Sequence, residues 1–399
     1  MIGIVDRAVH QQCNRKFGNS SNEEVFGVAN QTRQQTTTTL KERILLDTGI
    51  NSNILGVVTI PPMVAGLDVG GTKTNATLLD SKGVFLNNRM VETPSRVLEG
   101  PKAAIEAMAE AIELAIGGAG VHWESVRVIG LDTPGPASAN GVISSKGGTN
   151  FSGKEWRGFD IRTAVEDFFK LPVVYNNDAN AAALYAHQRF FGEDSMQHSS
   201  VSAIVGTGLG GGVVDNGRVI RGSCGMAGEL GHIRISLEDL LQDDQPIPKC
   251  NCGLFGDLES IASLTGITKN LLPYWLSKYQ NHPLANSESM TAAAKAVRGY
   301  AEKGDEMALR IFEQQAKAIG RMFSIAANFT DPDAYFVGGG IVEAEPHFRD
   351  WCMDIIRAST ELRDEQRQIV QFAVVPDLDM AGARGSALAA LQMLRIAAT

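Results

Sequence analysis

The sequence predicts an α/β fold built from two similar halves that face one cleft. Two regions open alike: strand Val64–Val69 runs into Gly70-Gly71, and strand Val201–Val205 runs into Gly206-Thr207-Gly208. In both regions a second strand, a short turn and a third strand follow, as in an antiparallel meander. A helix and a further strand come after each meander. The repeat therefore predicts a duplicated βββαβ core.

The first half takes its elements from periodicity and turn residues. Strand Lys73–Leu79 precedes the turn Asp80–Gly83, and a third strand is expected to reach Val91. Pro101 begins an Ala-rich helix that Gly117-Gly118 should end. The remaining elements expected here are strand Val126–Leu131, helix Ile161–Phe169, strand Val173–Tyr175 and helix Ala179–Phe190.

The second half repeats the opening and adds a long helix. Aligning Gly70 with Gly206 leaves the second turn two residues out of step, which one shorter turn explains. The expected elements are strands Gly212–Asp215 and Val219–Arg221, helix Asp305–Phe329 and strand Ala334–Val337. We expect a polar, poorly ordered extension over 1–62, a first lobe over 63–180 and a second over 181–381, with a helix over about 382–397 returning to the first.

Composition excludes several classes of protein. The chain has 399 residues, 44% of them hydrophobic, enough for two or three domains. Its net charge of −9 opposes binding to nucleic acids or anionic membranes, and residues 1–62 carry six basic against five acidic side chains. No apolar run approaches the roughly 18 residues of a membrane span, and residues Met1 to His10 lack the basic-then-apolar order expected of a signal peptide. Five cysteines are too few and too unevenly spaced for a disulfide framework. We expect a cytoplasmic protein.

The first motif is Asp68-Val69-Gly70-Gly71-Thr72-Lys73. A strand delivers the Asp68 carboxylate to its end, and two glycines let backbone N–H groups approach phosphate oxygens. Asp68 would hold Mg²⁺ through water. The alternative is an ordinary Gly-Gly hairpin. A Walker A loop is excluded, because Thr72 stands at the required Lys position and a strand follows instead of a helix.

The second motif, Gly206 to Gly212, contains the letters G-x-G-x-x-G. A dinucleotide-binding fingerprint must open a helix, whereas Gly212–Asp215 is a strand that leads into a hairpin turn. A second phosphate loop fits better, with the Thr207 hydroxyl and nearby N–H groups donating to terminal phosphate oxygens. A glycine-rich hairpin without a ligand is the alternative.

The third motif is Asn176-Asn177-Asp178-Ala179-Asn180, between a buried strand and a helix. Asp178 is a good helix N-cap, which is one interpretation. At the same strand end as the two phosphate loops, its carboxylate would instead accept the proton of a substrate hydroxyl that attacks phosphorus. Asn177 would then bond sugar hydroxyls.

The fourth motif combines Gly228-Glu229-Leu230-Gly231-His232 with a cysteine pair. His232, Cys250, Cys252 and a fourth donor five residues later have spacing that suits tetrahedral Zn²⁺. A hydrogen-bonded histidine beside a chance Cys-x-Cys is the alternative.

At these four motifs the sequence closely resembles the ROK family (repressors, open reading frames, kinases), within the actin-like, ribonuclease H-like superfamily of phosphotransferases. The resemblance runs from about Val64 to the C-terminus. It implies two actin-like lobes with an interlobe cleft, and phosphorylation of a hexose or aminohexose, usually at the 6-hydroxyl, by ATP or sometimes polyphosphate. It also implies a homodimer or homotetramer.

The resemblance also assigns roles by motif position. Asp178 corresponds to the general base. Asn177, Glu229, His232 and Glu259 correspond to sugar ligands, with Gly135 and Asn150 lining the sugar pocket from the first lobe. The nucleotide residues would be Gly70, Gly71, Thr72 and Lys73 for one phosphate segment, Thr207 and Gly208 for the other, and Gly338, Gly339 and Gly340 for adenosine.

One departure concerns the metal motif, which in the family ends in a cysteine where this chain has Asp257. Either His232, Cys250, Cys252 and Asp257 form a mixed-donor zinc site, or hydrogen bonds hold the loop without metal. The interval from His232 to Cys250 is also longer than the family's, which indicates a solvent-facing insertion at Asp243-Asp244.

We therefore expect an ATP- and Mg²⁺-dependent hexose kinase, with glucose as the first candidate substrate and zinc in a structural role. Two alternatives stay open. One is a kinase for another hexose or aminohexose, such as N-acetylmannosamine, N-acetylglucosamine, fructose or allose. The other is a sugar-responsive repressor, against which stand the nearly neutral N-terminal segment and the intact Asp178.

Overall fold

The computed structural model describes residues 61–135, 137–146, 150–375 and 378–397. These form two compact units, one made of the residues up to Asn176 together with those from Ser386 onward, the other of Asn177–Gly385. The expected N-terminal extension lies, except for Pro61 and Pro62, outside the described residues. Among those described, no helix is both long and apolar enough to cross a lipid bilayer.

A five-stranded sheet forms the centre of the first unit. Its spatial order is β3-β2-β1-β4-β5; β1 pairs antiparallel with β2 and parallel with β4, and β2 pairs antiparallel with β3. The strands are β1 (Met63–Val69), β2 (Lys73–Asp80), β3 (Val91–Pro94), β4 (Val126–Thr133) and β5 (Val173–Asn177).

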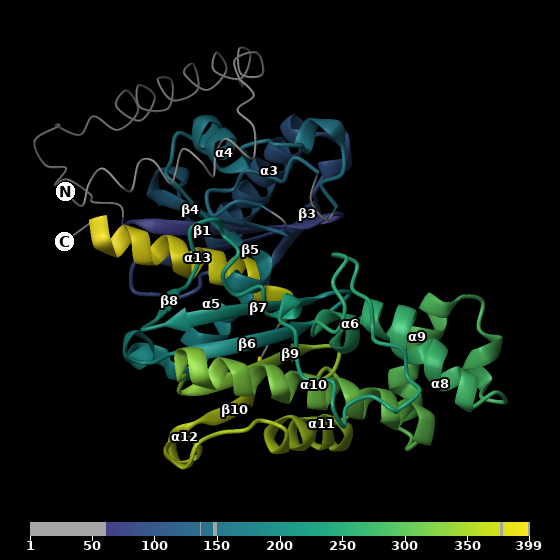
Figure 1. Ribbon diagram of the computed structural model, residues 1–399. Helices are drawn as coiled ribbons and strands as arrows, with labels where there is room; N and C mark the ends of the chain where they lie inside the picture. Colours follow the sequence, from purple (N-terminus) through teal and green to yellow (C-terminus); the bar gives the residue numbers. More distant parts are fainter. Residues whose placement is uncertain (1–60, 136, 147–149, 376–377, 398–399) are drawn as a thin grey trace, which may run out of the picture. The chain divides into compact units, whose positions relative to one another are not determined.

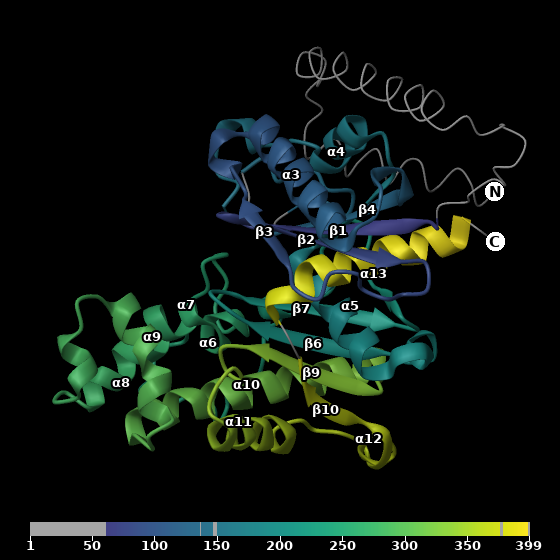
Figure 2. The ribbon, with the colours of Figure 1, turned by 180° about the vertical axis from the view of Figure 1, so that it is seen from behind.

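Helices cover both faces of this sheet. The helices α3 (Pro101–Ala119) and α4 (Ile161–Phe169) lie on one face, where Leu67 and Val69 of β1 belong to the same apolar core as α3 (Figure 1). The C-terminal part of α13 (Leu378–Ala397) lies on the other face (Figure 2). It packs closely on β4, because a Cβ atom at Gly130 would lie 1.9 Å from the Ser386 carbonyl oxygen.

The second unit repeats the sheet. Its order is β10-β9-β6-β7-β8. When β6 to β10 are matched in chain order with β1 to β5, the two sheets have the same strand order. The pairs β6–β7 and β7–β8 are antiparallel, while β6–β9 and β9–β10 are parallel. This confirms the duplicated core. The strands are β6 (Ser200–Val205), β7 (Leu209–Asp215), β8 (Arg218–Val219), β9 (Ala334–Gly339) and β10 (Gln371–Val374).

Alternation along β9 shows which helices cover this second sheet. Tyr335 and Val337 join the core of α10 (Glu306–Thr330), whereas Ala334 and Phe336 pack with Ala186 of α5 (Asp178–Phe191) on the opposite face. Figure 1 shows α5 and α10 on opposite sides of this sheet. The unit also contains α6 (Glu259–Ala262), α7 (Leu264–Gly266), α8 (Leu272–Lys278), α9 (Met290–Ala301), α11 (Pro346–Ala358) and α12 (Asp364–Ile369).

Two sequence-based boundaries are wrong for local reasons. The third strand begins at Val91 instead of ending there, because the Asn87 side chain accepts the Leu78 N–H and takes the place of a strand partner. Helix α3 passes through Gly117-Gly118 and continues to Ala119; Gly120, with φ of 65°, ends it in the left-handed conformation.

The close packing of α13 on β4 predicts a cost for any side chain at position 130. Gly130→Ala should destabilise the protein by about 1–3 kcal/mol or more, because the new methyl group meets a backbone carbonyl that cannot rotate away. Gly117→Ala, at an exposed position of helix α3 with open space around it, is the control and should be neutral or stabilising by about 0.5–1 kcal/mol. Thermal unfolding of both variants is the measurement, and equal melting temperatures would contradict the packing.

Candidate functional site

The N-terminus of helix α5 carries Asp178. Asn177 is the N-cap, since its side chain accepts the Asn180 N–H at 2.8 Å, and Asp178 is the first helical residue. The interpretation of Asp178 as the N-cap is therefore wrong. Its exposed carboxylate accepts the Ala179 N–H at 2.8 Å and lies at the positive end of the helix dipole.

Glycines of β7 bring α5 against this strand. A Cβ atom at Gly210 would lie 2.7 Å from the Ala179 Cβ, and one at Gly212 would lie 2.4 Å from the Ala183 Cβ. Larger residues would push the helix outward. Because Ala179 lies against Gly210, Asp178 lies near the start of β7, where the second glycine-rich turn ends.

Glu229 and His232 reach the same end of β7 on the short helix over Leu230–His232. This helix packs tightly on the strand, since a Cβ atom at Gly231 would lie 2.3 Å from the Leu209 carbonyl oxygen. Burial raises the pKa of Glu229; the charge of His232 acts against this shift and that of Glu259 adds to it. The three side chains thus form one electrostatic group.

Glu259, expected as a sugar ligand, connects two parts of the site. Its Oε2 accepts the Leu209 N–H at 3.0 Å, next to the turn Gly206–Gly208. Its Oε1 accepts a hydrogen bond from the Cys250 thiol at 3.4 Å. A Cβ atom at position 208 would lie 2.6 Å from Oε2, so a side chain there would displace the Glu259 carboxylate.

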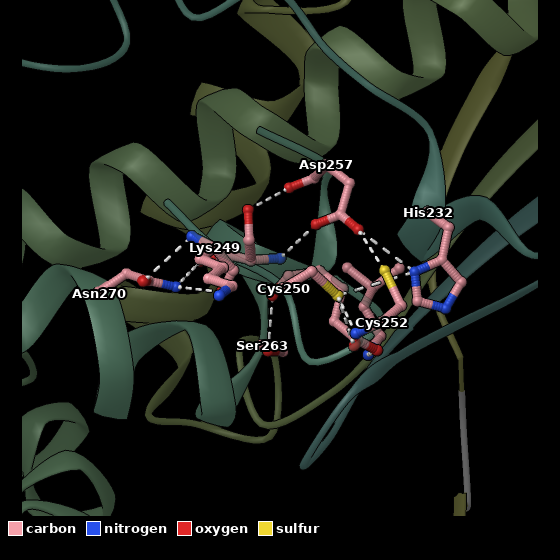
Figure 3. Close-up of polar contacts among 10 residues, drawn as sticks. His232, Lys249, Cys250, Cys252, Asp257, Ser263 and Asn270 are labelled. Atoms are coloured by element: carbon pink, nitrogen blue, oxygen red, sulfur yellow. Dashed lines mark hydrogen bonds and ion pairs between the residues drawn. The ribbon is translucent and has the colours of Figure 1, made fainter. Parts of the chain in front are cut away.

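The four expected metal ligands lie together, with one ligand atom of each within 4.8 Å of the others (Figure 3). Asp257 Oδ2 is 3.3 Å from His232 Nδ1 and 3.5 Å from Cys252 Sγ, and Cys250 Sγ is 3.9 Å from His232 Nδ1. Around a tetrahedral zinc ion, neighbouring ligand atoms lie about 3.3–3.8 Å apart. Donor types and spacing therefore fit a zinc site.

Hydrogen bonds to Asp257 set the electrostatics of this cluster. The bond from His232 is the main cause that raises the pKa of the histidine from 6.5 to about 9. Burial acts to raise the pKa of Asp257, but bonds from His232 and its neighbours outweigh burial, so that the pKa is lowered. Burial raises the pKa of the Cys250 thiol.

Contacts outside the cluster hold the loop that carries Cys250 and Cys252. Asn270 donates to the carbonyl oxygens of Lys249 at 3.1 Å and Ser260 at 2.8 Å, and accepts the Lys249 N–H at 3.2 Å (Figure 3). The segment Asp243-Asp244 is exposed, as expected, but Asp244 accepts a 2.7 Å hydrogen bond from the Tyr274 hydroxyl and pairs with Lys278. The long interval before Cys250 is thus anchored on α8.

The turn Gly206–Gly208 and the segment Gly338–Gly340, expected to bind phosphate and adenosine, meet at one sheet edge. Parallel pairing aligns Val205 with Gly339, and the Gly340 N–H donates to the Val205 carbonyl at 2.9 Å. Gly339 has φ of 83°, and a Cβ atom there would lie 2.0 Å from that carbonyl oxygen. Gly338, Gly339 and Gly340 therefore lie beside the turn Gly206–Gly208.

The expected nucleotide residues of the first unit form a tight turn, in which the Gly70 N–H donates to the Lys73 carbonyl at 2.9 Å. Asp68 Oδ2 accepts the Asn75 side-chain amide at 3.0 Å. Lys73 forms an exposed ion pair with Glu92 at 2.8 Å. Thr72 is exposed.

The structure also places one of the two expected first-lobe sugar residues beside this turn. The Asn150 side chain lies against Gly71, where a Cβ atom would be 2.5 Å from its Cγ, and Asn150 has a left-handed φ of 66°. Gly135 follows β4, and none of the contacts described joins it to the other expected site residues.

Sequence reasoning missed two residues of the second unit that hold these turns. Thr265 donates to the Thr207 carbonyl, and Arg298 donates to the Gly340 carbonyl at 3.2 Å. Neither residue lies in a recognisable motif. Thr265 lies 58 residues from its partner in the sequence, and Arg298 lies 42 residues from its own. Local sequence patterns do not predict contacts over such separations.

Comparison with known proteins identifies the family. The sequence profile of the ROK family matches residues 64–393. The chain belongs to the ROK family. The duplicated sheets are those of the two-lobe, actin-like fold that the sequence predicted.

Curated relatives and solved structures include several kinases. The glucokinase of Halalkalibacterium halodurans is 29% identical over 75% of this chain and 88% of its own length. The crystal structure of the ROK hexokinase from Thermus thermophilus is 31% identical and has a TM-score of 0.65, covering 84% of this chain and 99% of that one. A ROK family glucokinase from Streptomyces griseus in complex with glucose and AMPPNP is 28% identical, with a TM-score of 0.59, and covers 83% and 99%.

Two other relatives differ from these in activity. The N-acetylmannosamine kinase of Escherichia coli is 28% identical over 70% of this chain and 83% of its own length. The DNA-binding transcriptional dual regulator NagC of Escherichia coli is 31% identical, over 46% of this chain and 41% of its own length.

The raised pKa of His232 predicts how the metal-free protein responds to pH. Since the folded pKa of about 9 lies above the ordinary 6.5, the stabilisation from the protonated histidine is complete below pH 6.5 and is lost as the pH rises through 9. With a chelator present, the melting temperature of the wild type should fall over this range relative to that of His232→Gln. Parallel pH profiles of the two proteins would contradict the interaction with Asp257.

Proposed function

We propose that this chain transfers the terminal phosphoryl group of ATP to a hexose, with the 6-hydroxyl of glucose as the acceptor. That the chain is a sugar kinase follows from its family and from the kinases among its relatives. The observation that carries the finer proposal is the position of Asp178, at the start of β7 in the same unit as Glu229, His232, Glu259 and the second phosphate turn.

Asp178 acts as the general base in this proposal. Its exposed carboxylate accepts the proton of the hydroxyl that attacks phosphorus. Asn177 uses its side-chain oxygen to cap α5, which leaves its amide nitrogen to donate to a sugar hydroxyl. Glu229 and His232 accept and donate further hydrogen bonds to the sugar, so that binding orients the reacting hydroxyl.

Backbone groups bind the nucleotide. The N–H groups of Thr207 and Gly208, with the Thr207 hydroxyl, donate to phosphate oxygens. The turn Gly70–Lys73 adds the N–H groups of Gly71 and Thr72, since that of Gly70 closes the turn. Gly338, Gly339 and Gly340 are assigned to adenosine by resemblance to the family and by their position beside the turn Gly206–Gly208. Asp68 uses one carboxylate oxygen for Asn75, and the other suits a water molecule of Mg²⁺. Bound Mg²⁺ would neutralise charge on the phosphates.

Asp178→Asn tests the proposed base, because an amide cannot take the proton. Turnover of glucose should fall roughly 10²-fold or more with little change in the melting temperature, measured by coupled release of ADP. Asp167→Asn, an exposed aspartate on α4, is the control and should keep wild-type turnover. A folded Asp178→Asn protein with wild-type turnover would refute the role of this residue.

We also propose that His232, Cys250, Cys252 and Asp257 bind one zinc ion in a structural role. The support is the distance set above: the four ligand atoms lie within 4.8 Å of one another, and two of the distances between them fall in the range of a tetrahedral zinc ion. When bound, zinc would link the segment of Glu229 and His232 to the loop of Cys250 and Cys252. It would perform no step of the phosphoryl transfer.

Elemental analysis and calorimetry test the zinc proposal. Purified protein should contain about one zinc per chain, and binding should release protons, because histidine and thiols must lose theirs to coordinate. Loading with zinc should therefore reverse the pH trend of the metal-free protein, so that the melting temperature rises with pH. Asp257→Cys should bind zinc more tightly than the wild type, and Asp257→Ala more weakly. A metal content far below one per chain, before and after zinc is added, would reject the site.

The acceptor and the quaternary structure are the least constrained parts of the proposal. The N-acetylmannosamine kinase among the relatives makes an aminohexose the second candidate acceptor. A panel of hexoses and aminohexoses, with ATP and polyphosphate as donors, distinguishes them by kcat/KM. A repressor without turnover would bind sugar and DNA and release no ADP.

Resemblance to the family supports a homodimer or homotetramer, which light scattering measures.

A further inference from the structure

We propose that Thr265 is a positioning residue for the second phosphate turn: it fixes the peptide units of Gly206–Gly208 from behind, so that two consecutive N–H groups face the phosphates of ATP. The inference rests on the proposed function, because it assumes that this turn binds the nucleotide. Thr265 lies on α7, outside every motif found in the sequence.

Three hydrogen bonds connect α7 to the turn. The Leu264 N–H donates to the Gly206 carbonyl at 3.0 Å. The next N–H, of Thr265, donates to the Thr207 carbonyl at 3.0 Å, and the Thr265 hydroxyl donates to the same oxygen at 2.7 Å. Two successive carbonyl groups of the turn therefore point toward α7, and one of them accepts two donors.

Because peptide units are planar and trans, fixing these two carbonyl groups also fixes the direction of the N–H groups that follow them. In a trans peptide unit the carbonyl and the following N–H point in opposite directions. Holding the carbonyls of Gly206 and Thr207 toward α7 turns the N–H groups of Thr207 and Gly208 to the other side. In the described part of the chain neither of these N–H groups donates to a protein acceptor. Consecutive free N–H groups of this kind form an anion-binding concavity.

Neighbouring contacts prevent the turn from relaxing into another geometry. The Gly206 N–H closes it by donating to the Gly208 carbonyl at 2.9 Å. Beyond the turn, Glu259 accepts the Leu209 N–H at 3.0 Å, and its Oε2 occupies the space that a side chain at Gly208 would need. Loss of the Thr265 hydroxyl leaves the Thr207 peptide with a single donor and more freedom to rotate.

Thr268 offers a matched control. Its hydroxyl donates to the Leu264 carbonyl at 2.7 Å, three residues further along the same helical segment, and none of its described contacts is with the turn. A Thr→Val change at either position removes one hydroxyl-to-carbonyl bond at constant shape. Only the change at position 265 alters a bond to the proposed phosphate turn.

The experiment compares Thr265→Val, Thr265→Ser and Thr268→Val in the full chain. For Thr265→Val we expect the KM for ATP to rise about three- to tenfold, the effect of one hydrogen bond on orientation. The KM for the sugar should stay within about twofold. Thr265→Ser should restore wild-type values, and Thr268→Val should match the wild type, with similar melting temperatures throughout.

Calorimetric binding of ATP and of adenosine supplies a readout that needs no turnover. Thr265→Val should weaken the binding of ATP and leave the binding of adenosine unchanged, because only ATP carries phosphates. If Thr265→Val does not fold, Thr265→Ala replaces it in the same comparison. An equal loss of affinity for ATP and for adenosine in Thr265→Val would overturn the role of Thr265. So would equal ATP affinities of Thr265→Val and Thr268→Val. A wild type that binds ATP but phosphorylates no sugar would instead refute the proposed function, while the binding comparison still tests this inference.

Discussion

The close contact between α5 and β7 is the constraint on which the candidate site depends. Gly210 and Gly212 leave no side chain between strand and helix, so that Ala179 and Ala183 pack directly on the backbone of β7. This brings the first residue of α5, Asp178, to the end of β7 where the glycine-rich turn, Glu259 and the helix of Glu229 and His232 meet. The chemistry proposed for the chain follows from this one packing relation, because a base acts only within hydrogen-bond reach of the proton it removes.

Glu259 makes the loop of Cys250 and Cys252 part of the same arrangement. One carboxylate oxygen accepts from the backbone beside the phosphate turn, and the other accepts from Cys250. The loop itself is anchored by Asn270, and the insertion before it is tied to α8 through Asp244. A structural metal here would therefore act on the geometry of the proposed sugar ligands and of the turn Gly206–Gly208, without contacting a substrate. Secondary structure thus places the proposed base, Asp178. A loop held by hydrogen bonds places the residues around it.

Sequence alone predicted the parts of the fold that repeat or carry strong local signals. The two strand–turn–strand openings, helix α4 and the clustering of His232, Cys250, Cys252 and Asp257 follow from periodicity, glycine turns and ligand spacing. The third strand was misplaced, because the side chain of Asn87 replaces a strand partner and this contact depends on the folded chain. Thr265 and Arg298 were missed for a related reason, since a lone threonine or arginine gains meaning only through a partner far away in sequence. Asn177 shows the opposite case: the motif was found, but only the structure shows that it, and not Asp178, caps the helix.

The most direct test of this account is a crystal structure of the chain with glucose and a non-hydrolysable ATP analogue. The account predicts that a carboxylate oxygen of Asp178 lies about 2.6–3.2 Å from the sugar 6-hydroxyl, within hydrogen-bond distance of the atom that attacks phosphorus. A complex in which glucose binds with that hydroxyl beside another acidic side chain, and with Asp178 turned to solvent, would contradict it.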